Sequence, residues 1–431
     1  MKKKIQFNGE AKRAIDLALS SFNNLFITGK AGTGKSTLLE HIVERLEDVV
    51  VLAPTGIAAI NVGGETIHSF FRLKPGHELD EAIHLKLNKN RLDKYRSLKT
   101  ILIDEISMLR ADILDAIDVF LKRARNSNEY FGGVRVIFFG DLYQLPPVVS
   151  NDGAEAFYSK YESPWFFSAK IFESPDLFTE SISIEKIELD KIYRQSEANF
   201  ISILNGIRNN NISTKQLSEL NSLVDLHFEE DKNKWINLVT TNYQALSINE
   251  SKLSEIKSEE IEFNSLISGK IGNIRPNDDI VKVKKGAQVM FIVNDPEKRW
   301  VNGSIGEIVE IEESGEEGSN TLYVLLENGK TVEVNMHTWP IAKYHFVNGK
   351  FTREEIGSYT QIPLKLAWAI TIHKSQGKSF KNVIIDLGRG SFAHGQCYVA
   401  LSRCISMKSL VLRQAITRDD IIIDKYVEQF H

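Results

Sequence analysis

The segment Gly29–Ser36 combines the residue types that hold a nucleoside triphosphate. Its sequence, GKAGTGKS, has the spacing G-x-x-x-x-G-K-[S/T], in which glycines let backbone N–H groups turn toward a phosphate. The N-terminus of a following helix would add positive charge to the same anion site. We expect Lys35 to reach the β- and γ-phosphates and the Ser36 hydroxyl to bind Mg²⁺. The residues of this segment predicted to hold ATP are Gly32, Thr33, Gly34, Lys35, Ser36 and Thr37.

Two later positions carry groups suited to phosphoryl transfer. Asp104 and Glu105 close an apolar run, where a pair of carboxylates needs a positive partner nearby. We expect Asp104 to hold Mg²⁺ through water and Glu105 to orient the attacking water. Gln144 follows the next apolar run, and its amide can hydrogen-bond a phosphate oxygen or that water. Gln144 is therefore predicted to sense the γ-phosphate.

Alternating apolar runs and helical patterns would position these residues. The runs are typical of strands buried on both faces, and Ala111–Ala124 has an apolar stripe at helical spacing. The chain is therefore predicted to be an α/β protein with parallel sheets, which bind ligands at the carboxyl ends of their strands. The predicted strands are 25–27, 49–53, 100–105 and 134–141 in a first unit, and 235–241, 366–372 and 382–387 in a second unit that starts near residue 180.

A different pattern occupies the region from about residue 280 to 360. Short alternating segments are separated by turn signals such as Asn302-Gly303 and Asn328-Gly329. This pattern of short alternating segments and turns predicts a small β-barrel-like insertion in the second unit. The predicted domains are 1–178, with a small insertion near 64–85; 179–280 together with 361–431; and the β-rich insertion 281–360.

The composition excludes several classes of protein. The chain has 431 residues, 42% of them hydrophobic, and a net charge of −4, so any nucleic-acid site must be local and not a basic coat. Two cysteines without metal-ligand spacing favour a reducing compartment. The sequence shows no signal core and no apolar run of membrane-spanning length, so we expect a cytoplasmic protein, nucleoid-associated in a prokaryote.

Four further segments hold candidate contacts whose roles the residues alone leave open. His373 and Lys374 lie in a polar run before Gly377 that suits a grip on a sugar-phosphate backbone, although His373 could be a core histidine. His68 and Phe70 suit strand contact and base stacking, with a small local core as an equal alternative. Isolated arginines such as Arg194 and Arg403 cannot be selected by spacing, although transition-state charge calls for guanidinium groups from a neighbouring domain.

Taken in order, these segments resemble the PIF-type (petite integration frequency) DNA helicases of superfamily 1, in the RecD-related branch. The resemblance runs from about residue 7 to 412. The segments similar to the family's motifs are 29–36, 53–59, 103–108, 139–147, Tyr193-Arg194-Gln195, 367–377 and 398–403.

The resemblance implies an ATP-dependent helicase that moves 5′ to 3′ on single-stranded DNA and unwinds tailed duplex. It implies two RecA-like domains with ATP between them, and a small barrel of the Src-homology-3 type in the second. Arg194 and Arg403 would then reach the γ-phosphate, and Gly377 would line the nucleotide site. The strand contacts implied are Thr55, His68, Phe70, Thr241, His373 and Lys374. Replication, recombination, repair, telomere maintenance and four-stranded guanine structures are the implied settings, and we expect a monomer in solution.

One position departs from the family pattern. The family usually has a glutamine that reads adenine in its N-terminal motif, whereas this chain has Glu10 and Ala11 there, and Gln6 lies earlier. The sequence leaves strict selection of ATP over GTP open. Alternatives are a small-molecule kinase, a nucleotide-dependent DNA-binding switch, and a motor that uses RNA as its track.

Overall fold

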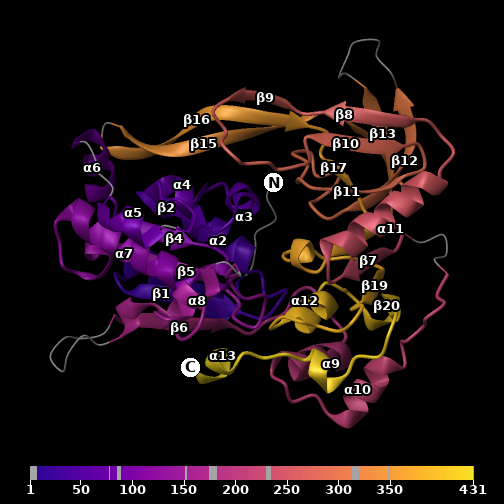
Figure 1. Cartoon of the computed structure of the whole chain (residues 1–431), viewed down its shortest axis with the longest axis horizontal. Coiled ribbons are helices and arrows are strands. Elements are labelled where there is room, and N and C mark those ends of the chain that lie inside the picture. The colour runs from indigo at the N-terminus through magenta and orange to yellow at the C-terminus, as the bar shows by residue number, and fades with distance from the viewer. Residues whose placement is uncertain are drawn as a thin grey trace. The chain divides into compact units, whose positions relative to one another are not determined.

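The computed structural model describes residues 7–76, 78–84, 89–150, 153–173, 182–229, 234–312, 320–347 and 349–430 (Figure 1). The chain forms two units. The first comprises Met1–Tyr193, Ala342–Glu355 and Lys425–His431, and the second comprises Arg194–Ile341 and Ile356–Asp424. The predicted α/β class is confirmed. No helix in the described ranges is both long and apolar enough to span a bilayer.

The first unit is built on a six-stranded parallel sheet in the order β3-β2-β4-β5-β1-β6. Its strands are β1 (Asn24–Gly29), β2 (Val49–Ala53), β3 (Glu65–Thr66), β4 (Thr100–Ile103), β5 (Arg135–Gly140) and β6 (Ile184–Leu189). Its helices include α1 (Gly9–Ser20), α2 (Lys35–Val43), α3 (Gly56–Asn61), α4 (Ile67–Phe71), α5 (Glu78–His84), α6 (Lys89–Arg96), α7 (Ala111–Arg125), α8 (Ala154–Tyr158) and α13 (Lys425–Gln429).

Helices cover both faces of this sheet, which explains its continuous apolar strands. Along β1, Leu25 and Ile27 pack with α1 and α2, whereas Phe26 between them packs on the opposite face with α7. Because successive strand residues point to opposite faces, every residue of a central strand must be apolar. The same reason accounts for the apolar runs in β2, β4 and β5.

The predicted boundary at residues 178/179 lies in the undescribed segment 174–181, and the prediction that a second unit starts there is wrong. β6 pairs with β1 in register Asn24↔Ile184 and adds an edge strand to the first sheet. The first unit therefore continues to Tyr193. The sequence IEKIEL alternates polar and apolar residues because an edge strand is only partly covered, so it lacks the apolar run of the central strands.

The second unit contains a four-stranded parallel sheet in the order β18-β7-β19-β20. Its strands are β7 (Ile236–Val239), β18 (Ala369–Thr371), β19 (Val383–Asp386) and β20 (Leu410–Leu412). Its helices are α9 (Ala198–Arg208), α10 (Thr214–Asn221), α11 (Asn242–Glu255) and α12 (Gln396–Ser402). The strands predicted at 235–241, 366–372 and 382–387 are thus present, with shorter bounds.

The region predicted to be a small β-barrel insertion, 281–360, is rich in strands, and these strands extend beyond it on both sides. The whole β-rich region holds a two-stranded sheet β10-β8, a five-stranded sheet β14-β13-β12-β11-β17 and a three-stranded sheet β15-β16-β9. The strands are β8 (Glu260–Asn264), β9 (Leu266–Gly269), β10 (Ile280–Lys284), β11 (Gln288–Phe291), β12 (Ile305–Glu312), β13 (Thr321–Leu326), β14 (Thr331–Val334), β15 (His337–Val347), β16 (Lys350–Gln361) and β17 (Leu364–Leu366).

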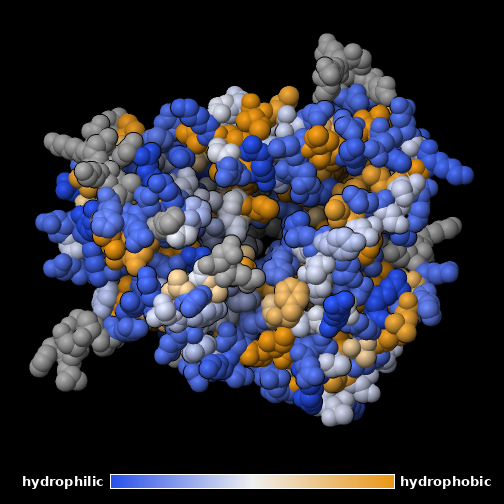
Figure 2. Space-filling model, viewed as in Figure 1, coloured by the Kyte–Doolittle hydropathy of each residue, from blue (hydrophilic) through white to orange (hydrophobic). Residues whose placement is uncertain are grey.

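One core of its own holds most of this β-rich region together. It includes Val283, Phe291, Val324 and Ile362. The distal part of β15 and β16, Ala342–Glu355, belongs instead to the first unit. There the Val51 N–H donates to the Tyr344 hydroxyl at 3.2 Å, and the Tyr344 N–H donates to Glu65 at 3.0 Å. On the face shown in Figure 2, hydrophobic residues occur in small groups among hydrophilic ones.

We predict that Phe120→Ala destabilises the first unit by about 3–5 kcal/mol, because it removes a large ring from a packed core. Phe120 is 1% exposed, and its ring centroid lies 5.3 Å from that of Phe71 and 4.7 Å from that of Tyr95. Denaturant unfolding would measure the change. Phe22→Ala is the matched control, since Phe22 is 94% exposed and its loss should cost less than about 0.5 kcal/mol.

Candidate nucleotide site and nucleic-acid contacts

The phosphate loop joins β1 to α2 through glycines in backbone conformations that other residues adopt at a cost. Gly32 and Gly34 have φ of 80° and 84°, and Gly34 is the residue that precedes the first turn of α2. A Cβ at Gly29 would lie 2.8 Å from the Leu189 carbonyl oxygen and the Thr33 hydroxyl, so the tight packing of loop against β6 requires glycine there. The loop therefore presents its backbone at the N-terminus of a nine-residue helix, as an anion site requires.

The Lys35 side chain contacts this loop, and its positive charge acts to lower the pKa of Asp104. Its Nζ donates to the carbonyl oxygens of Gly29 at 2.5 Å and Lys30 at 3.1 Å. Asp104, at the end of β4, is half-buried; burial and the adjacent Glu105 carboxylate raise its pKa to about 7, while Lys35 acts in the opposite direction. Glu105 itself has φ of 51°, a left-handed conformation that turns the chain sharply after the strand. The charges of Lys35 and Glu105 therefore both act on the Asp104 carboxylate, in opposite directions.

Gln144 is held by a neighbouring carboxylate. Its Nε2 donates to Asp141 Oδ2 at 3.1 Å, and both side chains are buried in the turn that follows β5. β5 lies between β4 and β1 in the sheet. Because the three strands are parallel, the phosphate loop, Asp104 and Gln144 all follow the carboxyl ends of adjacent strands. The structure brings these predicted catalytic groups to one edge of one sheet.

The oxygen groups at this edge suit Mg²⁺. Mg²⁺ prefers hard oxygen ligands and keeps several water or phosphate oxygens, so it needs only one or two protein groups. Ser36 supplies an exposed hydroxyl in the first turn of α2, and Asp104 supplies a carboxylate whose raised pKa shows that its negative charge is poorly compensated. No cluster of three or more His, Cys, Asp or Glu side chains in the described ranges could hold a metal alone. The donor set fits Mg²⁺ bound together with a nucleotide.

In the second unit, cationic side chains from three segments meet. Arg194 donates to the carbonyl oxygens of Ser402 at 3.1 Å and Gly377 at 3.5 Å. Arg403, 1% exposed, donates to Lys378 at 3.3 Å and to the Ser402 hydroxyl at 2.8 Å. Burial, together with the positive charges of Lys365 and Arg403, lowers the pKa of Lys378 to about 8. The predicted residues Arg194, Gly377 and Arg403 are therefore neighbours, in a region where an anion would relieve repulsion.

Four predicted strand contacts lie at starts of helices or in short turns that follow parallel strands. Thr55 and Thr241 precede α3 and α11, and each side chain accepts a hydrogen bond from a backbone N–H of its helix at 3.2 Å. His373 and the exposed Lys374 lie in a short 3₁₀ turn after β18. Burial lowers the pKa of His373, which favours the neutral ring. Nothing in these contacts tests DNA binding, which stays a prediction.

The structure places His68 and Phe70 in different environments. His68 is partly exposed, and its Nε2 lies 3.1 Å from Glu78 Oε1. The prediction that Phe70 stacks on bases is wrong, because Phe70 is 1% exposed. Its ring packs edge-on against Phe71 and Tyr95, and Lys94 Nζ lies 4.0 Å from the ring centroid. The alternative of a small local core holds for Phe70, since the helical register of α4 turns this ring inward.

Sequence reasoning did not select Tyr193 as a neighbour of the phosphate loop. The Tyr193 N–H donates to the Gly32 carbonyl oxygen at 2.8 Å, and its ring carbons lie 3.8–3.9 Å from where a Cβ of Gly34 would be. The ring is 54% exposed beside the loop. An exposed tyrosine between Ile192 and Arg194 carries no periodic signal, so only the pairing of β6 with β1 places it there.

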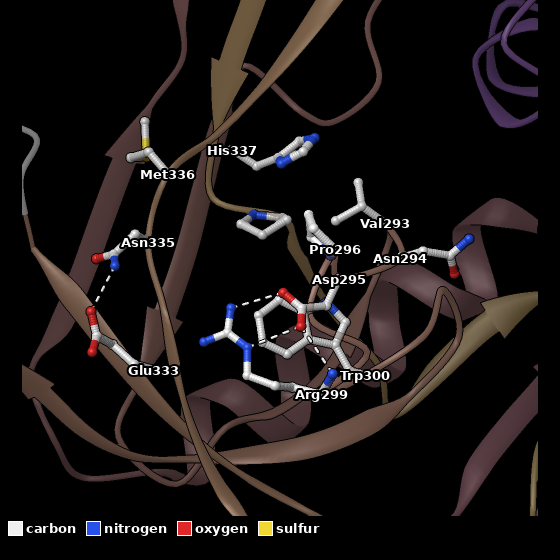
Figure 3. Close-up of a pocket in the computed structure, with 11 residues that line it drawn as sticks. Val293, Asn294, Asp295, Pro296, Arg299, Trp300, Glu333, Asn335, Met336 and His337 are labelled. Atoms are coloured by element: carbon white, nitrogen blue, oxygen red, sulfur yellow. Dashed lines mark hydrogen bonds and ion pairs between the residues drawn. The ribbon is translucent and has the colours of Figure 1, made fainter. Parts of the chain in front are cut away.

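A separate cavity of about 190 Å³ lies in the β-rich region (Figure 3). Its charged side chains are paired with neighbours. Asp295 holds Arg299 through two side-chain hydrogen bonds of 2.8 and 3.0 Å, and Glu333 accepts from Asn335 at 2.8 Å. Arg299 also lies over the Trp300 ring, 4.6 Å from its centroid. These pairs engage the charged side chains of the cavity, and none of the predicted catalytic residues lines it.

A glycine-rich loop, a lysine and an acidic pair at the carboxyl edge of a parallel sheet define a P-loop nucleotide-binding protein. A model described as PIF1-like helicase matches residues 6–218. The chain is 33% identical to the ATP-dependent DNA helicase Pif1 of Bdellovibrio bacteriovorus, over 99% of this chain and 92% of that protein. The chain belongs to the PIF1-like helicase family.

Other relatives agree with this assignment. The ATP-dependent DNA helicase PIF1 of Homo sapiens is 32% identical over 93% of this chain, which spans 60% of the human protein's length. The crystal structure of Bacteroides sp Pif1 with ADP-AlF4 has a TM-score of 0.88 at 37% identity, covering 99% of this chain and 96% of that one. The same Bacteroides protein bound to single-stranded DNA has a TM-score of 0.69, with the same identity and coverage.

We predict that Glu78→Gln lowers the free energy of unfolding by about 2 kcal/mol at pH 7, after allowance for screening by solvent. Burial alone would raise the pKa of Glu78, but the hydrogen bond with His68, backbone N–H groups and the Arg110 charge bring the pKa down to about 2. A carboxyl with a lowered pKa stabilises the fold fully above its ordinary pKa of 4.5, and this stabilisation is lost as the pH falls toward 2.

The difference between wild type and Glu78→Gln should therefore be smaller at pH 3.5 than at pH 7 in denaturant unfolding. An equal difference at both pH values would contradict the role assigned to this carboxylate.

Proposed function

We propose that this PIF1-like helicase is an ATP-driven motor that moves 5′ to 3′ along single-stranded DNA and unwinds tailed duplex. The observation that carries the proposal is the convergence of the phosphate loop, Asp104 and Gln144 at one sheet edge in a member of this family. Complexes of Bacteroides Pif1 with ADP-AlF4 and with single-stranded DNA support the same nucleotide and the same track.

The proposed chemistry follows from the residues at this edge. Lys35 neutralises the β- and γ-phosphates, while Ser36 and Asp104 hold Mg²⁺ with water and phosphate oxygens. Mg²⁺ supplies charge neutralisation at the transferring phosphoryl group. Glu105 orients the attacking water, and Gln144, fixed by Asp141, contacts the γ-phosphate or that water. The exposed ring of Tyr193, which lies beside Gly34, is proposed to contact the bound nucleotide.

Arg194 and Arg403 are proposed to stabilise the charge that develops on the γ-phosphate. Arg194 donates to the backbone carbonyl oxygens of Ser402 and Gly377, and the pKa of the neighbouring Lys378 is lowered by burial and also by the positive charges of Lys365 and Arg403. A planar guanidinium suits the equatorial oxygens of the transferring group. Gly377, whose carbonyl Arg194 contacts, would then lie near the nucleotide.

The architecture fits the same proposal. Each unit carries a parallel sheet of the RecA-like kind, and we propose that the β-rich region forms a small barrel of the Src-homology-3 type. Thr55, His68, Thr241, His373 and Lys374 are proposed to contact the strand, mainly through phosphate and sugar, so sequence preference should be weak. We keep the expectation of a monomer in the absence of DNA.

Lys35→Ala should lower single-strand-stimulated ATP hydrolysis at least about a hundredfold, because a charge that stabilises the transferring phosphoryl group is lost. Steady-state phosphate release with and without oligothymidylate would measure this change. Binding of labelled single-stranded DNA should remain detectable. Lys12→Ala, an exposed lysine on α1, is the control and should hydrolyse ATP normally. Normal turnover in Lys35→Ala would contradict the assignment.

The direction of movement is tested with matched duplexes that carry a 5′ or a 3′ single-stranded tail. We expect ATP-dependent strand displacement from the 5′-tailed duplex only, since the family resemblance implies 5′-to-3′ movement. Equal displacement from both would exclude this polarity. ATP hydrolysis stimulated by DNA without displacement from either duplex would instead support a nucleotide-dependent DNA-binding switch.

A further inference from the structure

Gln195 is a buried amide in the second unit, one residue after Arg194. It is 4% exposed. Its Nε2 donates to the carbonyl oxygen of Ser402 at 3.1 Å and to that of Cys404 at 2.9 Å. A side-chain amide has two N–H donors, so these two hydrogen bonds use both of them. The two acceptors lie on either side of Arg403, and Gln195 therefore holds the backbone from which the Arg403 side chain projects.

These carbonyl groups lie at the C-terminal end of α12 and just beyond it (Figure 1). The last four carbonyl groups of a helix have no partner within the helix, so a buried helix end needs donors from elsewhere. Gln195 supplies two such donors, although it lies 207 residues before Ser402 in the chain. The end of α12 is therefore held by a side chain from a distant part of the sequence.

Ser402 connects the two arginines. Its carbonyl oxygen accepts from Arg194 Nη1 at 3.1 Å as well as from Gln195, and its hydroxyl accepts from Arg403 Nη2 at 2.8 Å. Arg403 Nε also donates to the Val399 carbonyl oxygen at 3.0 Å, one turn earlier in α12. Both guanidinium groups are thus hydrogen-bonded to the same residue, and Gln195 holds the backbone of that residue.

The acceptors that these hydrogen bonds use are neutral groups. Backbone carbonyl and hydroxyl oxygens orient a guanidinium without cancelling its charge, whereas a carboxylate would form an ion pair with it. An ionised glutamate at position 195 would offer no donor to the two carbonyl oxygens and would add a negative charge beside both arginines. A neutral amide with two donors therefore orders this cluster and leaves the positive charge of the arginines for an anion.

Gln195 also lies next to the point where the chain enters the second unit. The chain passes from the first unit to the second between Tyr193 and Arg194. The Tyr193 N–H donates to the carbonyl oxygen of Gly32 in the phosphate loop, and two residues later Gln195 is bonded to the end of α12. The connection is anchored on both sides of Arg194, so a displacement of Gln195 would be passed directly to that arginine.

We infer that Gln195 and Ser402 are positioning residues that fix Arg194 and Arg403 relative to each other, so that both guanidinium groups act together on one γ-phosphate. This inference rests on the proposed function, which assigns the two arginines to the γ-phosphate, and it adds the groups that orient them. Stabilisation of a transition state depends on such preorganisation, and a displacement of about 1 Å can lower a rate on the order of a hundredfold.

The test uses the full chain with Gln195→Met, which keeps an unbranched side chain of similar length but removes both donors. In single-strand-stimulated ATP hydrolysis, kcat should fall about tenfold or more, because the arginines lose their fixed geometry. KM for ATP and Kd for labelled oligothymidylate should change less than about twofold, since the groups proposed to bind the nucleotide and the strand are still present.

A transition-state analogue gives a second readout that a purely structural role would not change. ADP-AlF4 mimics the transferring phosphoryl group, so Gln195→Met should weaken its binding about tenfold and leave the binding of ADP alone unchanged. The ratio of these two affinities does not depend on how much of the protein is folded. In a chain that already carries Arg194→Ala and Arg403→Ala, adding Gln195→Met should change the ratio less than about twofold.

Gln288→Met is the matched control. Gln288 is 8% exposed, and its Nε2 also donates to two backbone carbonyl oxygens, that of Trp235 at 2.6 Å and that of Ala367 at 2.8 Å. This variant loses the same kind of buried hydrogen bonds, so its stability should fall while its kcat stays within about twofold of the wild type.

Ser402→Ala is a milder variant that tests the other positioning residue. It removes the hydroxyl that accepts from Arg403 and keeps the carbonyl group that accepts from Gln195. Alanine is compatible with a helix, so the variant should fold. Its kcat should fall about threefold or more, with the affinity for ADP unchanged, because one contact that orients Arg403 is lost.

Normal kcat in Gln195→Met, or an equal loss of kcat in Gln288→Met, would overturn the role of Gln195. Equal weakening of ADP and ADP-AlF4, or a further tenfold change in their ratio without the two arginines, would also overturn it. Failure of Gln195→Met to fold, together with normal kcat in Ser402→Ala, would overturn the inference as a whole. A wild-type chain that does not hydrolyse ATP would instead refute the proposed function, and this inference with it.

Discussion

Parallel pairing of β4, β5 and β1 is the constraint on which the chemistry of the first unit depends. Parallel strands end at the same edge, so groups that follow three different strands are delivered to one place without any long-range code in the sequence. The backbone of the phosphate loop adds a second requirement, because Gly32 and Gly34 adopt positive φ and Gly29 packs against β6. Sheet order and glycine geometry together form the phosphate-binding edge.

In the second unit, parallel strands also bring several loops to one edge of a sheet, but these loops carry different side chains. Its sheet order β18-β7-β19 brings three loops to one edge, and these loops carry polar, basic and aromatic side chains in place of a phosphate loop. Arg194, Arg403 and Lys378 gather near the ends of α12 and of the turn after β18, where burial, together with the positive charges of Lys365 and Arg403, lowers the pKa of Lys378. The same kind of sheet edge thus carries the phosphate loop in the first unit, and in the second unit it carries the positive charges and the residues proposed to contact the DNA strand.

A strand or a site residue could be predicted from the sequence where its neighbours along the chain form a recognisable pattern. Central strands were predictable because burial on both faces forces continuous apolar runs, whereas β6 was assigned to the wrong unit because an edge strand needs only half of that pattern. Lys35, Asp104 and Gln144 could be selected because each follows such a run. Arg194, Arg403 and Tyr193 could not be selected from residue type, since isolated polar side chains look alike until the fold places them.

The sequence by itself determined the class of ligand that is bound, a nucleoside triphosphate, and the fold class. The glycine spacing of residues 29–36 and the apolar periodicity, which carry these two predictions, are local properties of the chain. Only the tertiary structure decided which side chains are available. Phe70 and Phe392 are the same residue type and each directly follows a serine, yet Phe70 is 1% exposed in a core and Phe392 is 63% exposed on a loop held by hydrogen bonds. The difference arises because burial depends on what packs against a ring, and the partners of Phe70, such as Tyr95, lie far along the chain.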